Sequence, residues 1–406
     1  MIMKKNRRIA MLGCITLVSI FLAAGCEKAP DRSQNTQTED SVSLSSEKMV
    51  SVQEAKDQIA KIKGKNIDGL QFPENFVLPT GKEAYEVKLT PWYTKDMKEM
   101  EDMIASLWND YQKADWSSVP EDSFSRKDKP NYYAVSKQDE ESGRMYSFDA
   151  GGFFCGNSMN DTELHMDRCV KQYDFEWGDT ASDKDEYELQ DGKLSVPEAV
   201  AYTEKQLNTY LHPFEKKQFT YKVQHLYVKK DAENGHYDYD MVIGRVYRGG
   251  VIDTCSDFYL SEGKYYPYTH CGIEIETTMC HKNSLDMIST GAECLDVASN
   301  KKYDKIISPL WAVQRIKNEI AHIGGLSFQE CGLLYLLVQD NRLAKEKDQD
   351  VYQGVDDNTY LRPVWAFMTE DRGISDGMRT SDVHGTSVVV DAIDGTLYYY
   401  EGTGGY

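Results

Sequence analysis

The chain has 406 residues and a formal net charge of −20, from 46 basic and 66 acidic side chains. This length allows two or three domains with buried cores. The acidic balance excludes nucleic acid as an expected partner and disfavours contact with anionic lipid, because both present negative phosphates. Beyond the N-terminal region, no window approaches the ~18 consecutive apolar residues of a membrane-spanning helix.

The first 26 residues have a basic start and then a short apolar stretch, Ile9 to Ala24, before Gly25-Cys26. This pattern resembles a bacterial lipoprotein signal with its lipobox. The resemblance implies a signal peptide at 1–25 and attachment of membrane lipid, such as palmitate, to Cys26. We therefore expect a lipid-anchored protein on the extracytoplasmic face of the cell membrane. An uncleaved N-terminal anchor is the alternative, and it leaves the remainder on the same side.

Residues 26–50 are almost wholly polar and predict a flexible tether, because they cannot bury enough apolar area to become ordered. Outside the cytoplasm cysteines form disulfides by default, and an odd number leaves at least one thiol unpaired or paired between molecules. Buried free thiols are the alternative, and the sequence does not determine the connectivity. Seven cysteines follow the tether: Cys155, Cys169, Cys255, Cys271, Cys280, Cys294 and Cys331.

Serine marks the start of three predicted helices, at Ser51, Ser195 and Ser308. At the first two, Glu54 and Glu198 stand three residues later, which is the pattern of a capping box. Pro309 follows the third serine, and proline in a first helical turn costs no hydrogen bond. A further apolar stripe at three- and four-residue spacing predicts a helix from Thr94 to Tyr111.

Alternating apolar residues predict two strands at 219–227 and 237–243, with Asn234-Gly235 in the turn between them. His225 lies on the apolar face of the first strand, where a hydrogen-bonded core histidine is favoured over a ligand. An acidic loop is expected at 179–191. Other predicted strands lie at 132–135, 144–148, 173–177, 332–338, 361–368, 387–392 and 397–400.

A capped helix followed by antiparallel strands thus occurs at 195–268 and 308–400, with a more degenerate copy at 94–177. We predict an α+β fold of repeated units, each with one helix packed on an antiparallel β-sheet. The predicted regions are an N-terminal α+β region at 51–190, a helix-plus-sheet unit at 195–300 and a C-terminal unit at 305–406.

The last unit contains Pro363-Val364-Trp365 in one strand and Val388-Val389-Val390-Asp391-Ala392-Ile393-Asp394-Gly395-Thr396 in the closing strand. In these residues it resembles a PepSY-type domain, most closely over 359–397 and moderately over 195–268. More loosely, the chain resembles the exported regulators of the Yyc two-component sensor kinase. The insertion at 339–358 and the cysteine-rich segment 271–294 depart from the pattern. The resemblance implies inhibition of a peptidase or adjustment of an envelope protein, without catalytic residues or cofactors.

Two patterns offer catalytic or metal chemistry. Gly373-Ile374-Ser375-Asp376-Gly377 matches the G-x-S-x-G nucleophile motif, with His384 close behind. That motif requires a turn from a strand into a helix, whereas here it joins two predicted strands, which favours a polar loop. His270, Cys271, Cys280 and His281 offer four candidate zinc ligands. Adjacent residues of a strand point to opposite faces, so His270 and Cys271 could not both face one ion, and a zinc site is disfavoured as well.

We therefore expect a binding or regulatory lipoprotein rather than an enzyme. Its partner would be another envelope protein (a sensor kinase, peptidase or wall enzyme) or a cell-wall polymer. Contact through aromatic strands and sheet edges would involve Trp365, Phe367, Tyr398, Tyr399 and Tyr400. One alternative is an envelope hydrolase acting on wall peptide or glycan. Another is a solute-binding lipoprotein, which predicts two α/β lobes with parallel sheets.

Overall fold

The computed structural model describes most of the chain from residue 47 onward, all of it within one unit, Val42–Tyr406. The described ranges are 47–91, 134–138, 144–149, 153–157, 169–175, 178–211, 218–232, 234–252, 265–267, 275–290, 295–320, 326–340, 358–369 and 386–401. Within them, no helix is both long enough and apolar enough to cross a membrane. Cys26, the predicted helix at 94–111 and the G-x-S-x-G segment lie outside these ranges.

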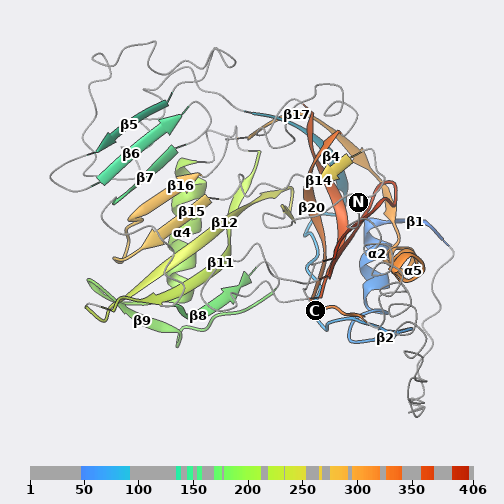
Figure 1. Ribbon diagram of the computed structural model, residues 1–406, viewed down its shortest axis with the longest axis horizontal. Helices are drawn as coiled ribbons and strands as arrows, with labels where there is room; N and C mark the ends of the chain where they lie inside the picture. The colour runs from blue at the N-terminus through green and yellow to red at the C-terminus, as the bar shows by residue number, and fades with distance from the viewer. Residues whose placement is uncertain are drawn as a thin grey trace, which may run out of the picture. The chain divides into compact units, whose positions relative to one another are not determined.

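A nine-stranded antiparallel sheet has the order β5-β6-β7-β16-β15-β12-β11-β8, and the short β13 also pairs with β12 (Figure 1). Its longest strands, β11 and β12, form the predicted hairpin around Asn234-Gly235. Gly235 has a φ of 77°, a conformation that glycine adopts without steric cost. The strands are β5 (Ala134–Gln138), β6 (Arg144–Asp149), β7 (Phe153–Asn157), β8 (Cys169–Asp174), β11 (Thr220–Lys230), β12 (Tyr237–Tyr247), β13 (Gly250–Val251), β15 (Ile275–Met279) and β16 (Met287–Thr290).

Helix α4 (Val196–Tyr210) runs across one face of this sheet (Figure 1). Ser195 and Glu198 form the predicted capping box. The apolar stripe of the helix packs on strand residues such as Leu226 and Met241 in a buried core. β9 (Glu186–Leu189) and β10 (Gly192–Ser195) pair as a hairpin that leads into the helix. The prediction of a loop over 179–191 was therefore wrong for β9.

A seven-stranded antiparallel sheet contains the C-terminal part of the chain, in the order β14-β20-β21-β22-β23. On one side of β21, β4 also pairs, and β4 in turn pairs with β17. β20 to β23 confirm the four strands predicted after residue 330. The strands are β4 (Ala84–Pro91), β14 (Tyr265–Pro267), β17 (Leu295–Tyr303), β20 (Glu330–Asp340), β21 (Thr359–Met368), β22 (Thr386–Asp391) and β23 (Leu397–Glu401).

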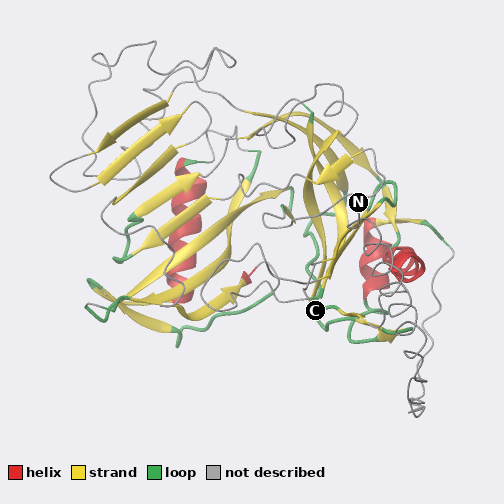
Figure 2. Ribbon diagram, viewed as in Figure 1, coloured by secondary structure: helices red, strands yellow, loops and turns green. Residues whose placement is uncertain are grey.

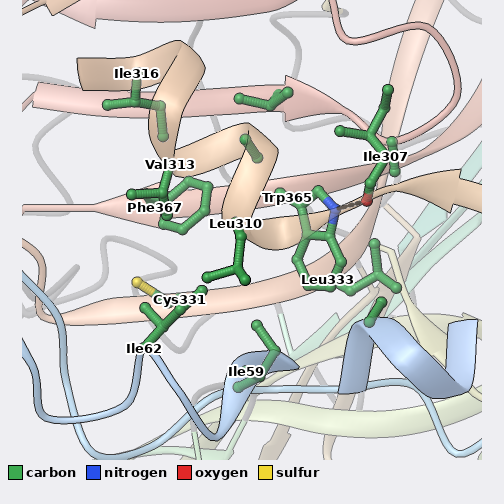
Figure 3. Close-up of a cluster of buried hydrophobic side chains, with 14 of the residues drawn as sticks. Ile59, Ile62, Ile307, Leu310, Val313, Ile316, Cys331, Leu333, Trp365 and Phe367 are labelled. Carbon is green, nitrogen blue, oxygen red and sulfur yellow. Dashed lines mark hydrogen bonds between the residues drawn. The ribbon is translucent and has the colours of Figure 1, made fainter. Parts of the chain in front are cut away.

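Two helices share a buried core with this sheet (Figures 1 and 3). α2 (Val52–Ile59) follows β1 (Met49–Ser51), α5 (Pro309–Ile320) follows β18 (Lys305–Ile307), and the two short strands pair antiparallel. Ser51 and Glu54 form the predicted capping box. The Ser308 hydroxyl accepts the backbone N–H of Trp311 at 3.3 Å, which confirms the third cap. A small three-stranded sheet is made by β2 (Asn66–Ile67), β3 (Leu70–Gln71) and β19 (Leu326–Ser327).

The predicted fold class, repeated α+β units of one helix on one sheet, was wrong. The protein is mostly β-sheet, with several antiparallel sheets (Figure 2). The sheets are assembled from segments that are far apart in the chain: β4 pairs with β17 and β21, β7 with β16, and β14 with β20. Hydrophobic periodicity locates a strand but carries no information about which distant strand will pair with it.

Candidate functional site

Three of the aromatic residues predicted to contact a partner lie in buried cores. Trp365 and Phe367 are 0% exposed, and Tyr398 is 1% exposed. The Trp365 indole donates a hydrogen bond to the Ile307 carbonyl at 2.8 Å (Figure 3). β21 has an apolar cluster on each face, so its side chains are covered on both sides. These residues are core rather than contact residues, which corrects the prediction; the side chains of Tyr399 and Tyr400 lie outside the described part.

The strands that carry the PepSY resemblance contain a buried ion cluster around Arg362, which the sequence analysis missed. Its Nε donates to Asp391 Oδ2 at 2.5 Å, and its Nη2 donates to Asp391 Oδ1 at 2.9 Å and to Asp394 Oδ2 at 2.8 Å. Its Nη1 pairs with Glu86. Burial lowers the pKa of Arg362, but these carboxylates raise it above its ordinary value. The cluster links β21 to β22 and β4, and we interpret it as structural.

Of the four weak metal candidates, Cys280 and His281 lie in the turn after β15, and His270 and Cys271 lie outside the described ranges. Asp286 accepts the backbone N–H of Cys280 at 2.7 Å, and its Oδ1 lies 3.2 Å from His281 Nδ1. Burial raises the pKa of the Cys280 thiol, so the thiolate that binds metals is disfavoured. Across the described ranges, no three His, Cys, Asp or Glu side chains are placed to hold a metal ion.

Three of the cysteines have described side chains that form no disulfide. Cys169, Cys280 and Cys331 carry free thiols, and the last two are buried. Burial also raises the pKa of Cys331 well above its ordinary value, with the charge of Glu330 acting in the same direction. These two thiols are therefore small buried hydrophobic groups, the alternative to disulfides that the composition allowed.

The sheet face opposite α4 carries rows of polar side chains. Residues directly opposite each other in an antiparallel ladder lie on the same face. None of these row residues belongs to the core beneath α4. We call this face the polar face, although it also carries some apolar side chains. Its rows are Asp174, His225, Val242 and Glu276; Gln172, Tyr227, Asp240, Thr278 and Met287; and Cys169, Lys229 and Asp238.

A β-bulge places His225 on the polar face. The β11–β12 register shifts between Val223 and His225, so Val223 packs under α4 whereas His225 points to the other side. The predicted alternation ran unbroken through this point and was wrong there. Gln224 is 1% exposed and donates to the Ile252 carbonyl at 3.1 Å. A Cβ atom on Gly244 would lie 1.9 Å from Gln224 Nε2, so a larger residue there would displace the Gln224 side chain.

His225 and Asp174 form a buried pair on this face. His225 Nδ1 lies 2.7 Å from Asp174 Oδ1, and the two residues are 3% and 8% exposed. Gln172 donates its amide to both Asp174 oxygens at 3.0 Å. His225 is therefore buried and hydrogen-bonded, as predicted, but it lies on the opposite face of the strand from the predicted one. Such a carboxylate orients an imidazole ring, which is one part of a general-base arrangement but is equally a structural pair.

Lys229 and Asp240 form a second pair, with side chains that are 11% and 16% exposed. The Thr278 hydroxyl donates to Asp240 Oδ1 at 2.7 Å. Asp238 lies opposite Lys229 in the ladder. Burial raises the pKa of Asp238, a hydrogen bond from Cys280 opposes this, and the negative charge of Asp240 adds to it. With Asp174 and Glu276, this face carries more carboxylates than basic groups.

Comparisons with known proteins assign no family. No protein-family model and no curated protein matches the sequence. Among solved structures, the chain is similar to an uncharacterized protein from Eubacterium rectale ATCC 33656, with 12% sequence identity and a TM-score of 0.49. The match covers 86% of this chain and 98% of that chain. At this level the similarity carries no inference about function.

Proposed function

We propose that this chain is a non-catalytic envelope lipoprotein that binds, and thereby regulates, another extracytoplasmic protein through the polar face of its nine-stranded sheet. The observation that carries the proposal is the acidic, partly exposed surface opposite α4. Glu276, Asp240 and Thr278 lie there side by side on neighbouring strands and are neither buried nor fully exposed. The signal at 1–26 supports the cellular location, with Cys26 as the lipid-bearing residue.

The chemistry of this face favours a partner segment that is basic or rich in hydrogen-bond donors. Its four carboxylates, Asp174, Asp238, Asp240 and Glu276, outnumber its basic groups, Lys229 and His225. The net charge of −20 adds a long-range field of the same sign, which speeds encounter with a basic partner. The same field disfavours anionic wall polymers as the ligand.

The described cysteines also support a binding role over a catalytic one. A nucleophilic cysteine needs a lowered pKa, whereas burial raises the pKa of Cys280, Cys331 and the half-buried Cys169. The hydrolase alternative depends on Ser375 and His384, which lie outside the described residues. The antiparallel large sheets do not match the parallel lobes that the solute-binding alternative predicts.

Site-specific photo-crosslinking in the native envelope tests the proposal. A photoreactive residue at Glu276 or Thr278 is expected to trap one discrete partner protein. The same residue at Ser299 or Lys301, exposed positions on β17, serves as the matched control. Equal trapping from β17, or no adduct from the polar face, would contradict the proposal.

A charge-reversal pair then measures specificity. E276K changes the charge of the polar face, whereas E188K makes the same change at an exposed position of β9. For the partner identified by crosslinking, E276K is expected to weaken binding by about tenfold and to reduce its salt dependence, and E188K to leave it near wild type. Equal affinities for the two variants would place the contact elsewhere.

A further inference from the structure

Lys229, Asp238 and Asp240 lie on the polar face of the β11–β12 ladder. Lys229 of β11 stands directly opposite Asp238 of β12, and Asp240 lies two residues further on the same face. The Lys229 Nζ pairs with Asp240 Oδ2. The Thr278 hydroxyl donates a hydrogen bond to the other carboxylate oxygen of Asp240, Oδ1, at 2.7 Å. The two strands therefore hold an amine against a carboxyl group, and a second acidic residue, Asp238, stands opposite the lysine in the ladder.

This pair differs from other lysine–carboxylate pairs of the described residues in its burial. The Lys229 side chain is 11% exposed. The lysine side chains that pair with Glu186, Glu204, Glu83 and Asp68 are 35% to 61% exposed. Tyr227, Val242 and Cys169 form an apolar cluster on the same face. The Lys229 side chain is therefore more shielded from water than the lysine side chains of those four pairs.

We propose that Lys229 and Asp240 become joined by an intramolecular isopeptide bond, with Asp238 as the proton-transferring acid. The Nζ–Cγ bond forms and a Cγ–O bond of Asp240 breaks. Two protons of the ammonium leave with that oxygen as one water molecule, so an ammonium and a carboxylate become a neutral amide. No oxidant, cofactor or other reactant is required.

The geometry supplies what this condensation needs. The strands hold amine and carboxyl in contact, which converts a bimolecular reaction into an intramolecular one. Burial raises the pKa of Asp238, so this group carries a proton at a higher pH than an ordinary aspartate does. It can therefore accept a proton from Lys229 and return one to the departing oxygen of Asp240. The product would tie β11 to β12 covalently.

The test is the intact mass of the purified protein, followed by peptide mapping. The reference, called the full sequence mass, is that of the mature chain from Cys26 with its attached lipid. The wild type is expected to weigh one water molecule less and to give a branched peptide that joins residues 229 and 240. K229R and D240A are expected to have the full sequence mass. D238N is expected to fold and to lack the bond or form it slowly. K222R, in the exposed pair with Glu204, is the matched control and keeps the mass deficit.

Two outcomes would overturn the proposal. The first is a folded wild type with the full sequence mass. The second is a mass deficit that persists in K229R, because a succinimide at Asp394-Gly395 also loses one water molecule. Circular dichroism of each variant serves as the folding control, so that a missing bond in a folded variant is not attributed to unfolding. The bond would be present in the isolated protein, so this test does not need the proposed partner. The bond would remove one carboxylate, Asp240, and one basic group, Lys229, from the polar face, and the remaining carboxylates would still outnumber the basic groups.

Discussion

The two large sheets handle buried charge in different ways. The seven-stranded sheet concentrates it at one point, where Arg362 contacts Asp391, Asp394 and Glu86. The nine-stranded sheet spreads it over one face as separate pairs, among them His225 with Asp174 and Lys229 with Asp240. A guanidinium fork is always charged and binds carboxylates in a fixed geometry, whereas imidazole and amine groups exchange protons. The first arrangement suits a structural role, and the second suits recognition or chemistry.

The largest expected loss of stability comes from removing the guanidinium of Arg362, which lies at the centre of the charged cluster in the seven-stranded sheet. R362M leaves the buried Asp391 without its partner and should lower the free energy of unfolding by about 3–5 kcal/mol. Urea denaturation measures this change. The matched control is K302M, which removes a cation from an exposed pair with Glu83 and should cost less than about 1 kcal/mol. Similar losses for the two variants would mean that Arg362 does not organise its sheet.

Breaking one of the separate charged pairs of the nine-stranded sheet should lower the free energy of unfolding by less than the loss of Arg362 does. D174A removes the carboxylate that both His225 and Gln172 contact, and the loss of these hydrogen bonds at a buried position should cost about 1–3 kcal/mol. D183A, an exposed aspartate in the same part of the chain, is the control and should change the free energy of unfolding by less than about 0.5 kcal/mol. If D174A lowered the free energy of unfolding as much as R362M does, the two sheets would not differ in how much one charged group contributes to stability.

The helix caps allow a direct comparison of the two sheets, because a helix with a capping box packs against each of them. S195A removes the cap of α4, and S51A removes the cap of α2. Each should lower the free energy of unfolding by about 1 kcal/mol. Hydrogen exchange at the first helical turn measures the local effect. Clearly unequal losses would show that the surroundings of one helix compensate for its cap.

The smallest effect is a dependence of stability on pH. Hydrogen bonds from the Ser195 side chain and backbone lower the pKa of Glu198 below its ordinary value of 4.5. A lowered carboxylate pKa stabilises the fold above the ordinary value, and the contribution is lost as the pH falls through the folded-state pKa. E198Q should therefore be less stable than the wild type at neutral pH and should approach it in acid. Parallel stability curves for the two proteins would contradict this account.

Local features of the fold were predictable, because they depend on neighbouring residues. Short sequence patterns predict the caps at Ser51 and Ser195 and the turn at Asn234-Gly235. No such pattern predicts the pairing of β4 with β17 and β21, because this pairing joins segments that are about two hundred residues apart or more. The fold class was wrong for this reason.

The candidate site was largely missed, and two signals were available for part of it. A continuous apolar run such as Val364 to Met368 is typical of a strand buried on both faces, which would have placed Trp365 in the core. A lone Arg362 at the start of that run implies a buried carboxylate partner. The bulge at Gln224 left no comparable signal, and without it His225 cannot be assigned to the correct face.

The pairing of β1 with β18 determines how a pull on the N-terminal segment would reach the folded body. Residues 49–51 form a ladder only three residues long with residues 305–307, and Ser308 next to it bonds the Lys48 carbonyl at 2.9 Å. Tension applied before residue 47 would load this ladder first. The force would pass to the start of α5 and the C-terminal sheet, and the nine-stranded sheet would be spared until the ladder broke.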